Sequence, residues 1–159
     1  VRGADVRRFD RLLGKHRYMG ETRPVGGFLR QAAALDGQWG GLLAWSSGCY
    51  ALWDRDACVG WTPTLRAERQ KRVVPNRRFA QLCGKGECPT LASRILAGAA
   101  KALPEQWRTE FGSVPALAET FTDSEANAGT CYKAVGREPL GRTRGFARHR
   151  ADFYAPCGG

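Results

Sequence analysis

One stretch of the sequence decides the fold: VVPNRRFAQLCGKGECPTLASRILAGAAKAL, residues 73–103. Its first ten residues predict a β-strand, in which Pro75 indicates a bulge or an edge position. The glycine-bearing loop 83–89 follows, and then a helix that Thr90 is expected to cap and Pro104 to end. This helix has apolar residues at every fourth position: Leu91, Ile95, Ala99 and Leu103.

The flanking sequence extends this pattern in both directions. Upstream, two apolar runs on either side of Asp36-Gly37 predict a β-hairpin over 28–45. Downstream, we expect a strand over 114–121, a short helix over 129–135 and the start of a last strand over 138–143. Alternating strands and helices favour an α/β fold. A chain of 159 residues suits one core, so residues 1–159 are expected to form a single domain.

The composition is that of a folded globular protein, with 43% hydrophobic, 25% charged and 10% aromatic residues. Wholesale disorder is therefore excluded. The most apolar stretch, 91–103, is interrupted by Ser93, Arg94 and Lys101 and is too short to cross a bilayer. We expect a cytoplasmic protein that does not associate with membranes.

The chain is strongly basic, with a formal net charge of +10. A basic surface favours anionic partners, which here include nucleic acid, tRNA or an acyl carrier. The arginines expected to contact such a partner are Arg69, Arg72, Arg77, Arg78, Arg142 and Arg144. The alternative is that these arginines are solvated surface residues that bind no partner. No motif for sequence-specific reading of nucleic acid is present, and the oligomeric state is not predicted.

Metal chemistry has little support in the sequence. Cys83 and Cys88 have the spacing of half a zinc site, but no second pair of Cys or His residues follows at a matching distance. We therefore predict no metal site.

Two family resemblances add expectations about fold and ligand. The order of elements from 73 to 143, together with Asn127-Ala128-Gly129-Thr130-Cys131-Tyr132-Lys133-Ala134-Val135-Gly136, resembles the core of the GCN5-related N-acyltransferases (GNAT). That resemblance implies a mixed sheet in which two neighbouring strands splay apart and bind the pantetheine arm of an acyl donor such as acyl-CoA. It also implies that amides of the loop before the long helix hold a pyrophosphate. The cofactor-binding candidates are then Asn76, Gly84, Lys85 and Gly86, although the loop departs from the usual Gln/Arg-x-x-Gly-x-Gly/Ala pattern.

The second resemblance extends along nearly the whole chain. Its motifs are His16-Arg17-Tyr18-Met19-Gly20, Gly60-Trp61, Val73-Val74-Pro75-Asn76-Arg77-Arg78-Phe79, Glu119-Thr120-Phe121, Gly129-Thr130-Cys131-Tyr132 and Gly141-Arg142-Thr143-Arg144-Gly145. In this order they resemble a bacterial family found in Druantia-type anti-phage proteins and beside or fused to transposases. The resemblance implies a role in defence or in a mobile element.

Four residues are candidates for catalysis. Cys131 begins a short helix, where a thiol becomes more acidic and nucleophilic; His16 would be its base and Glu119 the acid that orients His16. Glu119 in an apolar strand is also a candidate general base. Tyr132 occupies the position where the resemblance to acyltransferases implies a general acid for the departing thiolate.

Each of these residues also has a structural explanation. Cys131 could be a small buried hydrophobe, Glu119 the partner of one of the many arginines, and Tyr132 a half-buried packing residue. The favoured interpretation is a GNAT-like enzyme that transfers or cleaves an acyl or aminoacyl group. The alternative is a nucleic-acid-binding module of a defence or transposition system, without catalysis.

Overall fold

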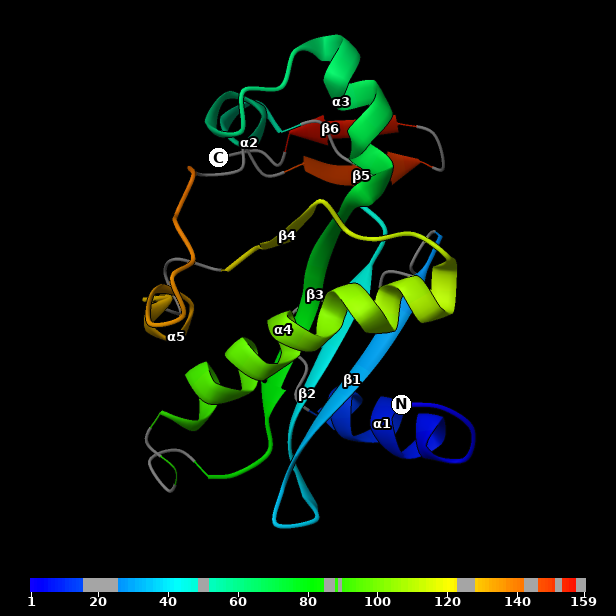
Figure 1. Cartoon of the computed structure of the whole chain (residues 1–159), viewed down its shortest axis with the longest axis vertical. Helices are drawn as coiled ribbons and strands as arrows, with labels where there is room; N and C mark the ends of the chain where they lie inside the picture. The colour runs from blue at the N-terminus through cyan, green and yellow to red at the C-terminus, as the bar shows by residue number, and fades with distance from the viewer. Residues whose placement is uncertain are drawn as a thin grey trace.

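A computed structural model describes residues 1–15, 26–48, 52–84, 88, 90–122 and 128–141, and the backbone of 146–150 and 153–156 (Figure 1). Within these residues the chain is an α/β fold: an open, mixed sheet flanked by helices. The sheet has four strands, in the spatial order β1 (Phe28–Leu35), β2 (Gln38–Ser46), β3 (Val73–Gln81) and β4 (Leu117–Thr120).

The strands pair as the sequence predicts over the first half of the sheet. β1 and β2 form the expected antiparallel hairpin, turning at Asp36 and Gly37, which both have positive φ (50° and 77°), as a tight two-residue turn requires. β3 adds antiparallel to β2, and β4 adds parallel to β3. Parallel pairing needs a long connection, and the segment containing α4 provides it.

The remaining elements surround this sheet. The helices are α1 (Asp5–Lys15), α2 (Trp53–Cys58), α3 (Pro63–Arg69), the 3₁₀ turn η1 (Gln70–Arg72), α4 (Leu91–Phe111) and α5 (Thr130–Lys133). A separate antiparallel pair is formed by β5 (Phe146–Arg150) and β6 (Phe153–Pro156). No helix among the described residues is both long and apolar enough to span a bilayer.

Two apolar clusters cover opposite faces of the sheet. α4 lies across one face (Figure 1) and buries the largest cluster, which includes Leu43, Trp45, Val74, Ile95, Leu96, Leu103 and Trp107. α1 packs on the other face through Phe9 and Leu13, against Leu42, Ala44 and Ala80. The helix α4 comes very close to the sheet at Gly41, where an added Cβ would lie 2.6 Å from Cδ1 of Ile95.

The prediction that Pro104 ends the long helix is wrong. α4 continues through Pro104 to Phe111. An interior proline removes one backbone hydrogen bond and costs about 3 kcal/mol. Leu103 and Trp107, each 2% exposed, are buried on either side of it, and this apolar burial offsets the cost.

Two smaller expectations also fail. Thr90 occupies the N-cap position of α4 but has a φ of 64°, and its side chain accepts no capping hydrogen bond. Residues 138–141, predicted to begin a strand, are irregular, and the next strand begins at Phe146. Residues 138–141 are exposed and pair with no strand among the described residues, and Pro139 lacks the N–H group that a strand ladder uses.

Candidate functional site

The strands β3 and β4 part after a short parallel ladder. They pair over four positions, from Val73 with Leu117 to Asn76 with Thr120. β3 then continues to Gln81, whereas β4 ends at Thr120. We call the point at Asn76 and Thr120, where the strands separate, the fork. Beyond the fork, no strand among the described residues pairs with β3 on this side.

A β-bulge in β3 lies directly at the fork. Asn76 pairs with Trp45 of β2 and Arg78 pairs with Ala44, so Arg77 is an extra residue. Residues opposite each other in a ladder share a face, which places Asn76 and Trp45 on the face covered by α4. A bulge bends its strand and increases the local twist, and this favours the separation of β3 from β4.

Two polar groups at the fork are buried without a partner. Asn76 is 3% exposed. Its Nδ2 atom and the Oγ1 atom of Thr120 have no hydrogen-bond partner within the described residues. An unsatisfied buried donor or acceptor costs about 1–3 kcal/mol, so natural proteins keep few of them. The hydroxyl of Thr120 lies close enough to the Tyr132 phenol to oppose the rise in its pKa, but no hydrogen bond joins the two groups, and both polar atoms at the fork are available to a ligand.

The helix α5 brings Tyr132 and Cys131 to the same face. The ring of Tyr132 lies edge-on to that of Phe79, with centroids 6.4 Å apart. Both α5 residues are half-buried and pack against the cluster under α4. Burial raises the pKa of the Tyr132 phenol above its usual value, so the hydroxyl is neutral and able to donate a proton at neutral pH.

Arg137, just after α5, also reaches this face. Its Nη1 donates to the carbonyl oxygen of Ala118 at 3.4 Å. Its guanidinium carbon lies 5.8 Å from the ring centroid of Trp45. Burial lowers the pKa of Arg137, and Tyr132 partly opposes this. Arg137 therefore places a positive charge beside the fork.

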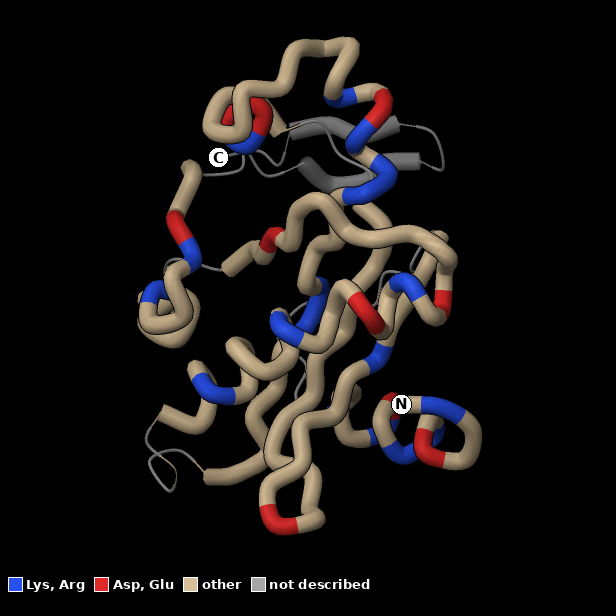
Figure 2. Tube along the Cα trace, in the orientation of Figure 1, with Lys and Arg blue, Asp and Glu red and all other residues tan. Residues whose placement is uncertain are grey.

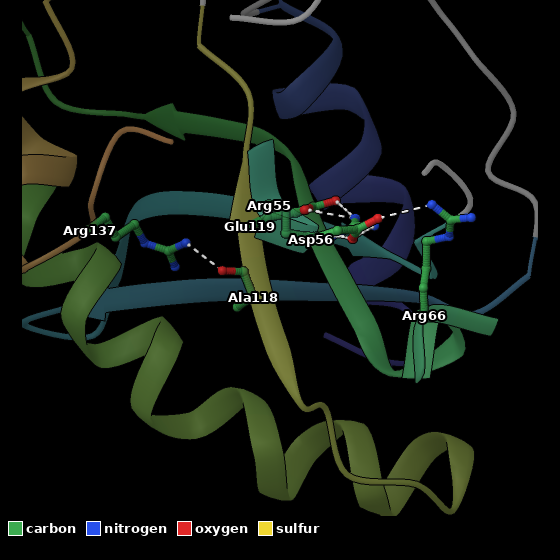
Figure 3. Close-up of polar contacts among 6 residues, drawn as sticks. All are labelled: Arg55, Asp56, Arg66, Ala118, Glu119 and Arg137. Atoms are coloured by element: carbon green, nitrogen blue, oxygen red, sulfur yellow. Dashed lines mark hydrogen bonds and ion pairs between the residues drawn. The ribbon is translucent and has the colours of Figure 1, made fainter. Parts of the chain in front are cut away.

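Glu119 belongs to a different group of residues, on the other face of β4. Side chains alternate along a strand, so Glu119 points away from the face shared by Ala118 and Thr120. Figure 3 shows Arg137 reaching Ala118 from one side of β4 and the partners of Glu119 on the other side. Nη1 of Arg55 lies 3.2 Å from Oε2 of Glu119.

These partners form a buried ion cluster, defined as Arg55, Asp56, Arg66 and Glu119. Nη2 of Arg55, which is 1% exposed, lies 3.0 Å from Oδ1 of Asp56. Arg66 of α3 approaches Oδ2 of Asp56 at 3.3 Å. Two positive and two negative side chains balance each other. Burial raises the pKa of Glu119, Arg55 opposes this rise, and Asp56 adds to it.

The structure therefore separates the four catalytic candidates. Cys131 and Tyr132 lie together on the α4 face, the face on which Asn76 also lies. Glu119 has the arginine partner that was considered as its structural explanation. His16 lies outside the described residues.

The ligand-binding candidates are also only partly described. Gly84 is described, whereas Lys85 and Gly86 lie outside the described residues, as do Arg142 and Arg144. Arg69 and Arg72 are exposed at the end of α3 and on η1, and Arg77 and Arg78 are half-buried in β3. Figure 2 shows the basic residues of α3 and η1 following one another along the chain. In the part of the chain with described side chains, no group of three or more His, Cys, Asp or Glu could hold a metal.

A separate open groove lies on the β1 side of the sheet. It has a volume of about 600 Å³ and runs between the edge strand β1 and α4, lined by residues such as Gln31, Ala33, Leu91 and Gly98. The polar group at its floor is already satisfied: Gln31 accepts from Trp45 at 2.7 Å and donates to Ala99 and Gln106. The groove has no unpartnered polar group comparable with those at the fork.

Four important residues escaped sequence reasoning. Arg55 and Asp56 are charged residues of a kind that is normally exposed, yet both are buried. Thr120 and Arg137 gave no signal of their own, because their environment depends on where β4 ends. Alternation along β4 was the one available clue, since it puts Glu119 and Thr120 on opposite faces.

Comparison with known protein families gives a match over nearly the whole chain. A family model described as Druantia protein DruA matches residues 4–154. No curated protein and no solved structure matches the chain.

Proposed function

Since this chain belongs to the Druantia protein DruA family, we propose that this member is an enzyme that transfers an acyl or aminoacyl group at the fork between β3 and β4. The observation that carries the proposal is the pair of unpartnered polar groups at the fork, Nδ2 of Asn76 and Oγ1 of Thr120. The proposal places the enzyme in the cytoplasm, in a defence or mobile-element system.

The open edge of β3 suits an extended acyl donor. Backbone N–H and C=O groups require partners, and beyond Asn76 no strand within the described part of the chain supplies them on the β4 side. An arm that contains amides, such as the pantetheine of acyl-CoA or of an acyl carrier protein, would pair there like an added strand. The mixed sheet, the bulge in β3 and the fork are consistent with a GNAT-like core. Gly84, Lys85 and Gly86 are the proposed contacts for the donor's phosphates.

Tyr132 is the proposed proton donor. The acceptor's nucleophile attacks the acyl carbonyl carbon, the carbon–sulfur bond breaks, and the departing thiolate takes the phenolic proton of Tyr132. The nucleophile loses its proton to a base, and His16 is the proposed base. In a variant of this route Cys131 attacks first and carries the acyl group as a thioester. Glu119 is proposed to brace α2 against β4 through Arg55.

The test is acyl transfer by the purified chain. It is incubated with acyl-CoA, acyl carrier thioesters and aminoacyl-tRNA, and release of the free thiol or tRNA and modification of an amine acceptor are measured by mass spectrometry. We expect turnover with one donor class, and its loss in Tyr132→Phe. Cys131→Ser distinguishes the two routes, because only the covalent route requires the thiol. Absence of turnover and of any covalent adduct with all three donor classes would refute the enzyme.

A second candidate function is binding of a nucleic-acid backbone without catalysis. It is favoured by Arg69, Lys71 and Arg72, which are exposed within four residues on α3 and η1. Fluorescence anisotropy with short DNA and RNA at several salt concentrations measures this directly. Replacement of all three by Gln should weaken binding and reduce the salt dependence by about one phosphate contact for each residue lost. Equal binding by the triple variant would exclude this surface.

A further inference from the structure

We infer that the fork takes a substrate that bears a carboxylate, and that Arg137 binds this carboxylate together with Asn76 and Thr120. The inference rests on the proposed function only for the statement that the anion is part of a substrate. The site itself follows from the contacts of the described residues.

Among the described side chains, Arg137 has no negative partner. It is half-buried, yet no carboxylate lies within 4.0 Å of it in the part of the chain with described side chains. Its hydrogen bond to the Ala118 carbonyl, 3.4 Å long, uses only one of five N–H donors. Buried charges in proteins are normally paired, because desolvation of a lone charge is costly. In the ion cluster on the opposite face, Arg55 is paired at 3.0 and 3.2 Å.

The other unused donors lie in the same place. Trp45, Asn76 and Thr120 form one row across β2, β3 and β4, since each pairs with the next. Arg137 lies over Trp45 at one end of this row and contacts Ala118 beside the other end. One guanidinium, one amide NH₂ and one hydroxyl therefore point to a common ligand that accepts hydrogen bonds.

The charge of the site favours a carboxylate over a phosphate. Arg137 supplies a single positive charge, and the amide and hydroxyl are neutral. A carboxylate carries one negative charge and accepts two parallel hydrogen bonds from a guanidinium. A phosphate monoester carries nearly two charges at neutral pH, which would leave an excess of negative charge in a half-buried site. Tyr132 is neutral at this pH and can donate but adds no charge.

Access to the site depends on α5. This helix has only four residues, and none of them is fully buried. Cys131 and Tyr132 of this helix are half-buried against the cluster under α4. Entry of a ligand beside β4 would expose part of these two side chains, at a lower cost than movement of α4, which has six buried residues.

The experiment uses acetate as the probe and the 159-residue chain. Thermal unfolding is followed in sodium acetate, in sodium phosphate and in sodium chloride at equal ionic strength. Wild-type protein should be stabilised by acetate in a saturable way, beyond the effect of chloride and at lower concentrations than phosphate. Arg137→Gln should weaken the apparent affinity for acetate at least tenfold, and Asn76→Asp should abolish it by adding a negative charge. The exposed Arg94→Gln is the matched control and should bind like wild type.

Three results would overturn the inference: equal effects of acetate and chloride, unchanged acetate binding in Arg137→Gln, or tighter binding of phosphate than of acetate. If Arg137→Gln does not fold, Arg137→Lys is the second variant. It keeps the positive charge but loses the planar guanidinium, and it should bind acetate more weakly than wild type. Failure of this inference can be distinguished from failure of the proposed function, because turnover of acyl donors is measured separately. Acetate binding that depends on Arg137 in a protein without turnover would retain the site and refute the enzyme.

Discussion

The two faces of β4 differ in whether their buried polar groups have partners. On one face, Glu119, Arg55, Asp56 and Arg66 satisfy one another in a cluster with balanced charge. On the other face, Asn76 and Thr120 have unpartnered polar atoms, and Arg137 has no carboxylate partner among the described residues. The two faces therefore have different roles. The ion cluster holds α2 and α3 on the sheet, whereas the polar groups on the other face are available to bind a ligand.

The largest effect is expected from Arg55→Met in the ion cluster. This change leaves Asp56 and Glu119 buried without their main partner and should reduce the free energy of unfolding by about 3–5 kcal/mol. Urea denaturation measures the loss. Arg108→Met, which removes an exposed ion pair with Glu105, is the control and should cost no more than about 0.5 kcal/mol. Equal stability of the two variants would mean that the buried cluster is not a structural brace.

At the fork, Tyr132→Phe should affect activity rather than stability. Loss of a general acid lowers the rate of acyl transfer by about 10²-fold or more. The ring and its contact with Phe79 are kept, so the unfolding transition should stay close to that of wild type. Trp53→Phe, at an aromatic residue that is 83% exposed, is the control and should retain full activity. A rate within twofold of wild type in Tyr132→Phe would remove the phenol from the mechanism.

Thr120→Val is expected to stabilise the protein. The substitution replaces an unpartnered buried hydroxyl by a methyl group of the same shape, in a strand where valine is favoured, and should add about 1 kcal/mol. Thr64→Val on the exposed start of α3 is the control and should change stability little. A lower stability of Thr120→Val would show that the hydroxyl has a hydrogen-bond partner in solution. The polar groups on this face of β4 would then be satisfied, as those of the ion cluster are.

The smallest effect concerns pH. Burial raises the pKa of Glu119 in the folded state above its usual value of 4.5, so the folded protein binds this proton more tightly than the unfolded chain does. The contribution of Glu119 to stability is therefore largest below pH 4.5 and falls as the pH rises through the folded pKa. Glu119→Gln should show a shallower decline of stability over this window in urea denaturation at several pH values. A parallel pH profile in wild type and Glu119→Gln would contradict the raised pKa.

Local patterns were enough to predict much of the fold. The hairpin from β1 to β2 follows from two apolar runs around Asp36-Gly37. The continuation of α4 past Pro104 could not be predicted in the same way, because tertiary burial of Trp107 outweighs the local cost of proline.

The candidate site was predicted only in part for a similar reason. Tyr132, Cys131 and Asn76 were selected, and they lie on one face. The grouping of Glu119 with them ignored the alternation of side chains along β4. Arg137 could not be selected among 25 basic residues, since only packing distinguishes a half-buried guanidinium from exposed ones.

The extra residue in β3 has a consequence for how this strand tolerates change. In a regular strand, residues three apart such as Asn76 and Phe79 project to opposite sides, yet both face α4 here, paired with Trp45 and Leu43, because Arg77 is an extra residue. Deletion of Arg77 would leave Asn76 and Phe79 on their present face and make the pairing with β2 regular. A relative that lacks this position could therefore keep the packing beneath α4 but would lose the bend that favours the separation of β3 from β4.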